Sequence, residues 1–415
     1  MTPAQRFKPF ALAAALAAGV TAVQIILACA ASGEPDPGQA HLRLDEYDSF
    51  LYADIVDRGY VCPPSPTPDS HGNVAFFPGY PASAWLVHAA TGWPTPVSLL
   101  VAAQLACWGF WTYFFLLFDR WRVPPRLAAL GCVLMATRPS AFFLVAGYSE
   151  PLFLMSLLGF LYWSETESPA GRVLAALHGF MLSATRIVGI PVAVYPILHA
   201  WLNAPRAGAS GPHGLVRRLA PALAVAAPAA LGGGLFFLYC QCRFGHWDLY
   251  MRTQNLGWKV RPDCFAFFHE DPYRWTWPQW KYGFYEPTWF SHMTALLFLP
   301  LVAAFLVAEV RLARSRSPEA GEAGWRERVG MYVVAWMIYY ISAAGVSRLN
   351  MTSMSRYVLG PEVLLVLCLV HILSRPGAKG GLPVWLRIAL GLWATAGLAY
   401  EIVGVIRFAH GLWVA

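Results

Sequence analysis

The sequence is poor in charged residues. Only 13% of its 415 residues are Asp, Glu, Lys or Arg, roughly half the usual share, whereas 57% are hydrophobic and the mean hydropathy is +0.46. This scarcity excludes a water-soluble chain of this length. The 18 Trp, 18 Tyr and 25 Phe exclude a disordered chain. Because the apolar residues form long runs and not short alternating segments, a transmembrane β-barrel is disfavoured and an all-α polytopic membrane protein is predicted.

Several catalytic signatures are also missing. The sequence contains no Gly-rich phosphate loop, no HExxH motif, no nucleophile elbow and no repeat of fixed period. The cysteines lack zinc-ligand spacing. Cys62, Cys242 and Cys264 fall outside the predicted spans, where one disulfide could form. We predict no cofactor, and a divalent metal is disfavoured because Asp45 and Asp48 do not form a tight D-x-D pair.

Eleven apolar runs are read as membrane helices, of which the pieces between residues 151 and 202 are shorter than a full span. The predicted spans are 11–31, 95–118, 127–147, 151–163, 173–185, 188–202, 219–240, 293–310, 331–347, 358–373 and 388–408. The first run resembles a cleavable signal peptide in its basic start and small residues, but its length favours a retained helix. The whole chain, 1–415, is therefore predicted to be one membrane domain.

The charges predict the orientation of these helices. With the N-terminus inside, the inside loops hold 17 of the 30 Lys and Arg residues, and the outside segments hold 14 of the 23 acids. The net charge of +7 is thus a topology signal and no indication of nucleic-acid binding. The outside segments 32–94 and 241–292 are too long for simple connectors, so the chemistry is expected there.

An acidic helix is predicted over residues 45–60, and it ends at a glycine. At helical spacing, Asp45, Asp48 and Tyr52 fall on one face. The apolar segment Phe-Phe-Pro-Gly-Tyr-Pro at 76–81 would cover this face at the membrane. A partly desolvated carboxylate gains basicity and suits a general base. The alternative is an ordinary surface helix with solvated acids.

Six segments resemble, in order, motifs of the class V GPI mannosyltransferase (PIG-V) family and its bacterial relatives. Residues 47–60 are similar to W-D-S-x-x-Y-x-x-I-A-x-x-G-Y, 76–81 to F-F-P-L-Y-P, 148–153 to Y-S-E-S-L-F, 185–189 to T-R-S-x-G, 245–258 to G-D-P-x-x-F followed by Q and W, and 355–357 to a late R-Y. Tyr47 replaces the usual Trp. His246-Trp247-Asp248 replaces G-D-P, which puts the acceptor in doubt.

This resemblance implies a GT-C fold and an inverting transfer of a hexose, above all mannose. The donor would be a polyprenyl-phosphate sugar, the acceptor a lipid-linked molecule or a glycan, and the active site would face out of the cytoplasm among the membrane lipids. Asp48 matches the family's acid and is the predicted base, with Asp45 in reserve. The Ala-, Arg- and Trp-rich composition points to a bacterial plasma membrane. The sequon at 350–352 leaves the endoplasmic reticulum open.

Four arginines are predicted at the donor phosphate, because cations within spans or at their outer ends are functional by default. They are Arg356, Arg186, Arg138 and Arg348, with the Tyr357 hydroxyl in support. Their alternatives are snorkelling and pairing with acids such as Glu150 or Glu362.

Six further residues are predicted to bind the acceptor or the sugar. They are Tyr52, Tyr148, Glu150, Asp248, Gln254 and Trp258. For Glu150 the alternative is a favourable interaction with a helix N-terminus, and for the last three it is loop packing. The rival function is a secondary transporter or lipid flippase, although no inverted repeat is visible. Within enzymes, a GT-C protein that uses arabinose or glucose is also open.

Overall fold

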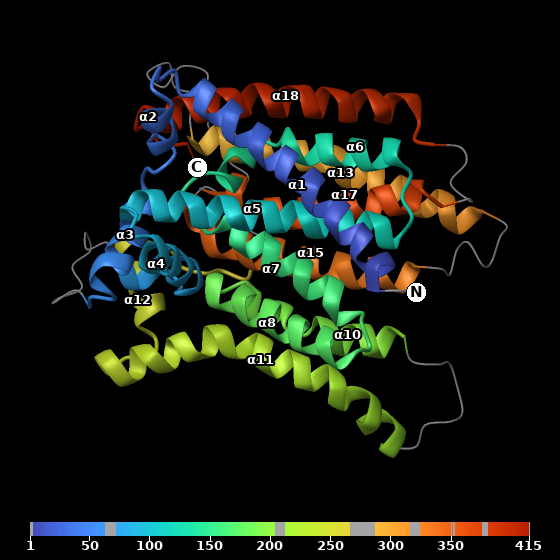
Figure 1. Ribbon diagram of the computed structural model, residues 1–415. Coiled ribbons are helices and arrows are strands. Elements are labelled where there is room, and N and C mark those ends of the chain that lie inside the picture. Colours follow the sequence, from blue (N-terminus) through green and yellow to red (C-terminus); the bar gives the residue numbers. More distant parts are fainter. Residues whose placement is uncertain are drawn as a thin grey trace.

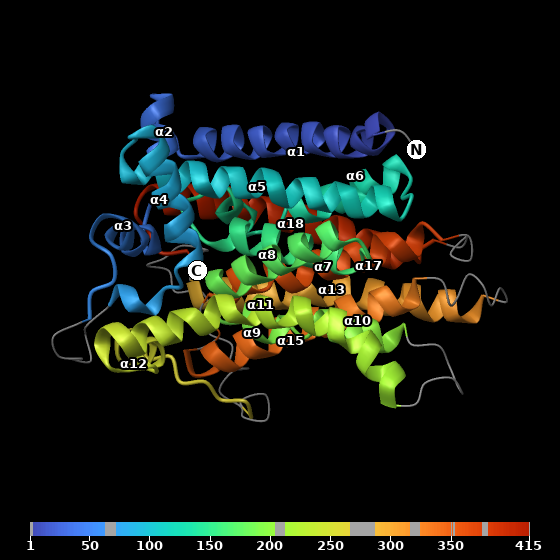
Figure 2. The ribbon, with the colours of Figure 1, turned by 60° about the horizontal axis from the view of Figure 1, so that its bottom comes forward.

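The computed structural model describes residues 3–62, 72–203, 212–265, 287–315, 324–349, 351, 353–375 and 381–414. Throughout these residues every regular element is a helix, and the long helices lie side by side in a bundle (Figures 1 and 2). In chain order the first elements are α1 (Pro3–Ala31), α2 (Pro37–Leu42), α3 (Asp48–Arg58), η1 (Asn73–Ala75), α4 (Gly79–Thr91), α5 (Thr95–Arg120), α6 (Pro125–Ala136), η2 (Ala141–Leu144), α7 (Glu150–Ser164), α8 (Pro169–Thr185), α9 (Gly189–Val192) and α10 (Tyr195–Leu202). The others are α11 (Pro212–Phe244), α12 (Leu249–Gly257), α13 (Pro287–Arg314), α15 (Trp325–Val346), η6 (Ser347–Leu349), α16 (Met354–Tyr357), α17 (Leu359–Leu373) and α18 (Val384–Ala409).

Seven of the described helical segments are long and apolar enough to cross a membrane. They are Pro9–Ala31, Thr95–Arg120, Leu219–Phe244, Leu296–Arg314, Trp325–Leu349, Met354–Leu373 and Val384–Ala409. Each coincides with one of the eleven runs predicted from the sequence. By the length and composition of these helices the chain is an integral membrane protein, and the all-helical prediction is confirmed for the described residues.

The predicted count of eleven spans is not confirmed. The other four runs fall on shorter helices, namely α6, α7, α8 and the pair α9 and α10. The run 127–147 shows the reason most clearly, because α6 ends at Ala136. Pro139 follows, lacks a backbone N–H and disfavours helical geometry in the residue before it. A short η2 turn fills the remainder of that run.

The buried centre of the bundle is α17. Nearly all of its residues are inaccessible to solvent, including Leu364, Val366 and Leu369, each with 0% of its surface exposed. A helix that is apolar on every side is expected to be surrounded by other helices. Elsewhere small residues allow close packing: a Cβ atom at Gly232 of α11 would lie 2.0 Å from the carbonyl oxygen of Phe180 in α8.

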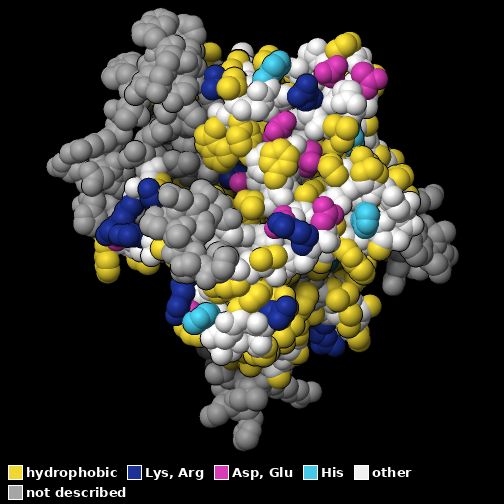
Figure 3. All heavy atoms as spheres, turned by 90° about the vertical axis from the view of Figure 1, so that its left-hand side faces the viewer, with side chains coloured by type: hydrophobic (Ala, Val, Ile, Leu, Met, Phe, Trp, Pro, Cys, Tyr) yellow, Lys and Arg dark blue, Asp and Glu magenta, His cyan; other side chains and the backbone are white. Residues whose placement is uncertain are grey.

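Four short helices gather at one end of the bundle. α2, α3, α4 and α12 lie together at the end opposite the N-terminus, and the C-terminus lies at the same end (Figures 1 and 2). α2, α3 and α4 belong to the predicted outside segment 32–94, and α12 belongs to 241–292. Residues 63–71 and 266–286 of these segments lie outside the described residues. Viewed from this end, acidic and basic side chains stand among apolar ones (Figure 3).

Candidate active site

Helix α3 brings Asp48 to the centre of this end. It begins at Asp48, directly after Tyr47 with φ 57°, and stops at Gly59, whose φ of 74° breaks the helix as predicted. The buried Ser49 hydroxyl donates a 2.9 Å hydrogen bond to the carbonyl oxygen of Gly147. The first turn of α3 is thereby fixed to the segment that leads into α7.

Asp45 lies outside the helix, which corrects the prediction that Asp45 and Asp48 share one helical face. Its side chain is buried beside Gly147, where a Cβ atom would approach the carboxylate Oδ1 to 2.6 Å. Burial raises the pKa of Asp45 to about 7, against a smaller lowering by a hydrogen bond with Ser49. Asp45 does not line the cavity that Asp48 faces.

A cavity of about 320 Å³ opens between the end helices and the bundle. Asp48 and Tyr52 of α3, Glu150 of α7 and Arg186, which follows α8, contribute polar groups to its wall. The other lining residues are mainly apolar, and many of them come from α7, α15 and α17. They include Phe153, Leu154, Ile338, Ile341, Val346 and Leu359. A cavity lined by both charged and apolar side chains suits a ligand that has a charged part and an apolar part.

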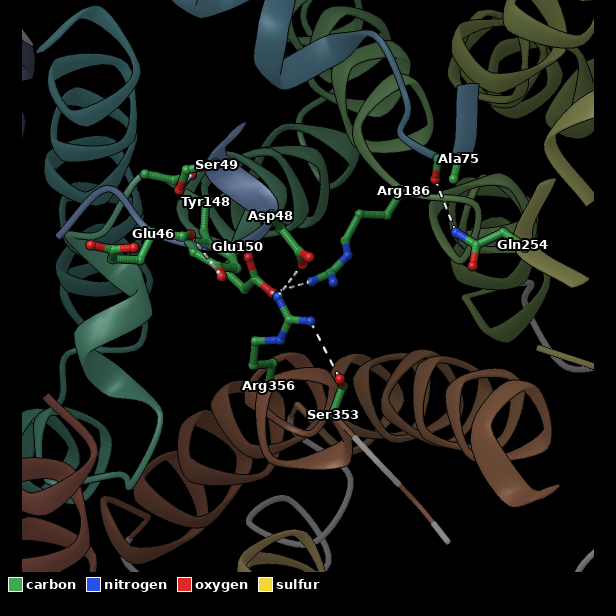
Figure 4. A network of polar contacts seen from close by, with 11 residues as sticks. Glu46, Asp48, Ser49, Ala75, Tyr148, Glu150, Arg186, Gln254, Ser353 and Arg356 are labelled. Carbon is green, nitrogen blue, oxygen red and sulfur yellow. Dashed lines mark hydrogen bonds and ion pairs between the residues drawn. The ribbon is translucent and has the colours of Figure 1, made fainter. Parts of the chain in front are cut away.

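Four charged side chains form an alternating chain along the polar wall (Figure 4). Arg356 Nη1 lies 2.9 Å from Asp48 Oδ2 and 3.8 Å from Glu150 Oε1. Glu150 Oε1 in turn lies 3.1 Å from Arg186 Nη1. Two carboxylates and two guanidinium groups balance in charge, which allows burial without a large uncompensated field. This set joins four segments that are far apart in the sequence.

Glu150 and Arg356 are the most buried of these groups. Glu150 is 2% exposed and is the first residue of α7, where the helix dipole favours a negative charge. Neither of its oxygens accepts a hydrogen bond of good geometry from the described residues. For Arg186, burial is the largest single influence and would lower the pKa, but Glu150 together with Tyr357 and Tyr52 outweighs it and the pKa is raised. Both arginines therefore stay cationic.

Aromatic rings enclose the guanidinium groups. Arg356 Cζ lies 5.1 Å from the ring centre of Tyr148, and Arg186 Cζ lies 5.0 Å from that of Tyr357. Tyr148 is buried and donates a hydrogen bond to the carbonyl oxygen of Glu46. Burial raises the pKa of Tyr148 and of Tyr52, so both phenols stay protonated at neutral pH.

Two of the predicted phosphate ligands lie away from the cavity. Arg138 forms a buried pair with Glu362 of α17, in which its Nε lies 2.7 Å from Oε2. This is the pairing that the sequence left as the alternative. Arg348 lies near the surface with its Nη2 3.1 Å from Asp263 Oδ2. Neither arginine lines the cavity, whereas Tyr357 does.

Of the three residues predicted in segment 241–292, one lines the cavity and two do not. Gln254 lines the cavity, and its amide donates a 2.9 Å hydrogen bond to the carbonyl oxygen of Ala75. Trp258 packs edge-on against Phe76, with 5.6 Å between ring centres. Asp248 is paired with Arg252 at the surface, 2.8 Å away, and that hydrogen bond lowers the pKa of Asp248.

Some cavity residues were not foreseen. Tyr250 lines the cavity one turn before Gln254 on α12, and Ile338, Ile341, Ser342 and Gly345 line it from α15. The α15 residues recur at the spacing of one helical face, which is the signal that could have identified them. Within the described part of the chain, no group of three or more His, Cys, Asp or Glu side chains is arranged to hold a metal ion.

No model of a protein family matches the sequence, and no curated protein matches it. Among solved structures, the archaeal oligosaccharyltransferase AglB from Archaeoglobus fulgidus, in complex with an inhibitory peptide and a dolichol-phosphate, has a TM-score of 0.48 and 11% identity over 96% of this chain. A second structure of the Archaeoglobus fulgidus oligosaccharyltransferase, tethered to an acceptor peptide, has a TM-score of 0.45 and 11% identity.

This chain spans about 56% of the length of those oligosaccharyltransferases. At such scores and identities the likeness assigns no activity to it. Membership of the class V GPI mannosyltransferase family likewise stays a prediction.

Proposed function

We propose that the protein is a membrane glycosyltransferase that moves a hexose, mannose in the first instance, from a polyprenyl-phosphate sugar to a hydroxyl of a lipid-linked or glycan acceptor. The observation that carries the proposal is the joint presence of Asp48, Arg186 and Arg356 at one cavity beside an apolar wall. Sugar transfer from a lipid phosphate needs a base, cations for the departing phosphate and a surface for an isoprenoid.

The reaction is balanced in atoms and charge. The acceptor oxygen forms a bond to C1 of the sugar, the bond between C1 and the phosphate oxygen breaks, and the hydroxyl proton passes to Asp48. The donor phosphodiester carries one negative charge and the released polyprenyl phosphate carries up to two. Protonation of Asp48 offsets this increase, so the net charge of the enclosed site stays constant. Such compensation avoids the free-energy cost of charging a poorly solvated cavity.

The cavity also offers groups for the sugar and the acceptor. The Tyr52 hydroxyl and the Gln254 amide lie on its wall, and both groups can form hydrogen bonds with sugar hydroxyls. Rings such as Tyr250 and Phe76 provide flat surfaces against which a sugar can stack. The acceptor is proposed to reach Asp48 from the end of the bundle where α3 and α12 lie. With this end outside the cytoplasm, the reaction takes place at the outer face of a bacterial plasma membrane.

A secondary transporter or lipid flippase is the second candidate. It would also place ionisable residues in the membrane, in paths that reach the bilayer midplane. One buried pair, Arg138 with Glu362, resembles such an arrangement. The cavity charges lie instead at one end of the bundle, which favours the transferase.

The test is sugar transfer by purified protein in liposomes, with a labelled polyprenyl-phosphate mannose as donor and a mixture of lipid-linked acceptors. Asp48→Asn removes the base and should lower transfer by about 10²- to 10⁴-fold in protein that is still folded at the assay temperature, as its Tm will show. Asp57→Asn is the matched control, because Asp57 lies on the same helix, is exposed and accepts a hydrogen bond from Thr95 that Asn can also accept.

Wild-type rates in Asp48→Asn would rule out the base assignment. Failure of the wild-type protein with mannose, glucose and arabinose donors alike would contradict the transferase, and movement of the labelled lipid across the bilayer would then favour the flippase.

A further inference from the structure

The two arginines of the cavity have different surroundings, and Arg356 is the more enclosed. Its Nη1 is engaged by Asp48 at 2.9 Å, and its Nη2 lies 3.4 Å from the Ser353 hydroxyl. The rings of Tyr148, Phe143, Tyr357 and Trp413 all have their centres within 5.9 Å of its Cζ. The residue is only 5% exposed. Arg356 also lines the cavity and its Nε has no hydrogen-bond partner among the described residues, but a phosphate at this guanidinium would compete with the carboxylate of Asp48.

Arg186 has much more free hydrogen-bonding capacity. Its side chain is 20% exposed towards the cavity, compared with 6% for Arg356. Among the described residues its ion-pair partner is Glu150 alone, at 3.1 Å, and one face of its guanidinium is covered by the ring of Tyr357. A guanidinium has five N–H donors, so most of those on Arg186 remain available to a phosphate.

The direction of the proposed reaction separates the two arginines further. In an inverting displacement, the acceptor and its base approach the sugar from the face opposite the leaving group. A cation in contact with Asp48 therefore stands on the acceptor side. Arg186 pairs with Glu150 and, unlike Arg356, forms no ion pair with Asp48 among the described residues (Figure 4).

We infer that Arg356 is a positioning residue, which holds the Asp48 carboxylate in place for proton transfer, and that Arg186 is the residue that binds the lipid phosphate. This division rests on the proposed function. Arg356 fixes the carboxylate through one short contact and is itself held by Ser353 and the aromatic rings. Arg186 exchanges the carboxylate of Glu150 for the phosphate when the donor arrives.

The experiment compares Arg356→Gln and Arg356→Lys with Arg186→Gln and Arg186→Lys. Transfer is measured across about pH 5 to pH 9 to obtain kcat and the donor KM. Binding of sugar-free polyprenyl phosphate is measured separately by tryptophan fluorescence in detergent. Arg58→Gln is the control, because Arg58 forms an exposed pair with Asp54 on the same helix as Asp48. The Tm of each variant reports whether it folds, and the Lys variants keep the charge if a Gln variant does not fold.

The expected results differ in kind. Arg356→Gln should lower kcat about tenfold or more with the donor KM within about threefold. Arg356→Lys, which keeps the positive charge, should restore part of kcat. Arg186→Gln should weaken polyprenyl phosphate binding about tenfold or more, which Arg356→Gln should not.

The opposite pattern overturns the inference. Weaker phosphate binding in Arg356→Gln than in Arg186→Gln would make Arg356 the phosphate ligand. A loss of kcat in Arg356→Gln that follows a loss of Tm, with no recovery in Arg356→Lys, would reduce Arg356 to a structural role. If the wild-type protein transfers no sugar but binds polyprenyl phosphate through Arg186, the proposed reaction fails while the phosphate assignment stands. Equal binding in all variants contradicts that assignment.

Discussion

Each end of the bundle contains a glutamate paired with arginine, but the two glutamates differ in how many of their oxygens accept hydrogen bonds. At the cavity end, Glu150 lies between Arg186 and Arg356, and neither of its oxygens accepts a hydrogen bond of good geometry from the described residues. At the other end, Glu165 follows α7 and pairs with Arg120 of α5 at 2.9 Å. There, the second oxygen of Glu165 accepts a 2.9 Å hydrogen bond from the Tyr195 hydroxyl.

At the end with Glu165, which we call the closed end, the charged groups are engaged by neighbouring protein side chains. Arg120 also donates to the carbonyl oxygen of Tyr162 and covers the ring of that residue, with its Cζ 3.7 Å from the ring centre. Trp121 donates a 3.0 Å hydrogen bond to Glu327 and stacks on His371. Except for the Nδ1 atom of His371, which has no hydrogen-bond partner among the described residues, these groups are paired across α5, α7, α10, α15 and α17, which is how a structural network is built.

The difference shows how to recognise a binding site among buried charges. Composition does not separate the two ends, since both combine arginines, glutamates and aromatic rings. The cavity end combines a glutamate whose oxygens accept no hydrogen bond from the described part of the chain with space for a ligand, whereas at the other end both oxygens of Glu165 are engaged. A substitution at the closed end should therefore change stability, and one at the cavity end should change binding or transfer.

The largest effect is expected at Asp45, which lies at the cavity end but is closed off from the cavity. Its pKa of about 7 lies above the usual value, so its stabilising contribution is full below about pH 4 and is lost as pH rises through 7. Asp45→Asn should raise stability at pH 8 by on the order of 3 kcal/mol and change it little at pH 4.

Thermal unfolding in detergent at both pH values measures this, with Asp57→Asn as the exposed control. Equal stabilisation at both pH values would contradict the burial argument. The rate of sugar transfer by Asp45→Asn should stay within about tenfold of wild type at pH 7, because Asp45, although predicted as a reserve base, does not line the cavity.

The closed end is tested by Glu165→Gln. This change removes the charge opposite Arg120 and should lower stability by about 2 kcal/mol, since it leaves a partly buried cation without its anion. Transfer measured below the unfolding temperature should equal that of the wild type. Glu167→Gln, two residues away and exposed, serves as the control. A loss of transfer without a loss of Tm would show that this end takes part in function.

Much of the bundle follows from the sequence, because apolar runs of spanning length report directly on membrane helices. All seven spanning helices coincide with predicted runs. The runs that ended in short helices contain proline at critical places, such as Pro139, or lie between closely spaced turns. Apolar composition marks burial in both cases, and it does not separate a spanning helix from a short one packed inside the protein.

The cavity shows where sequence reasoning reaches its limit. The choice of Asp48, Glu150, Arg186 and Arg356 as candidates required residue type, local pattern and, for Asp48 above all, the resemblance to a known family. Their mutual pairing required the fold, since Asp48 and Arg356 are 308 positions apart. The same holds for Arg138, whose partner Glu362 lies 224 residues away and satisfies it in the core. Tertiary contacts of this kind leave no periodic signal in one sequence.

A smaller effect is expected from Glu150→Gln, which sharpens the comparison with Glu165. If the phosphate displaces Glu150 from Arg186, removal of that carboxylate should tighten polyprenyl phosphate binding about tenfold, or about 1.4 kcal/mol. Binding by tryptophan fluorescence measures this, and Glu46→Gln is the control because Glu46 does not line the cavity. Weaker binding in Glu150→Gln would mean that Glu150 holds the arginines together for the phosphate.

The smallest effect is expected from Arg348→Gln, because Arg348 belongs neither to the cavity lining nor to the network around Glu165. Its pair with Asp263 has 60% of the arginine side chain exposed, and such pairs contribute about 0 to 1 kcal/mol. Polyprenyl phosphate binding should stay within about twofold of wild type, in contrast to the loss expected for Arg186→Gln. The same binding measurement decides the matter. A tenfold loss would return Arg348 to the phosphate site, because a screened surface pair cannot produce a change of that size.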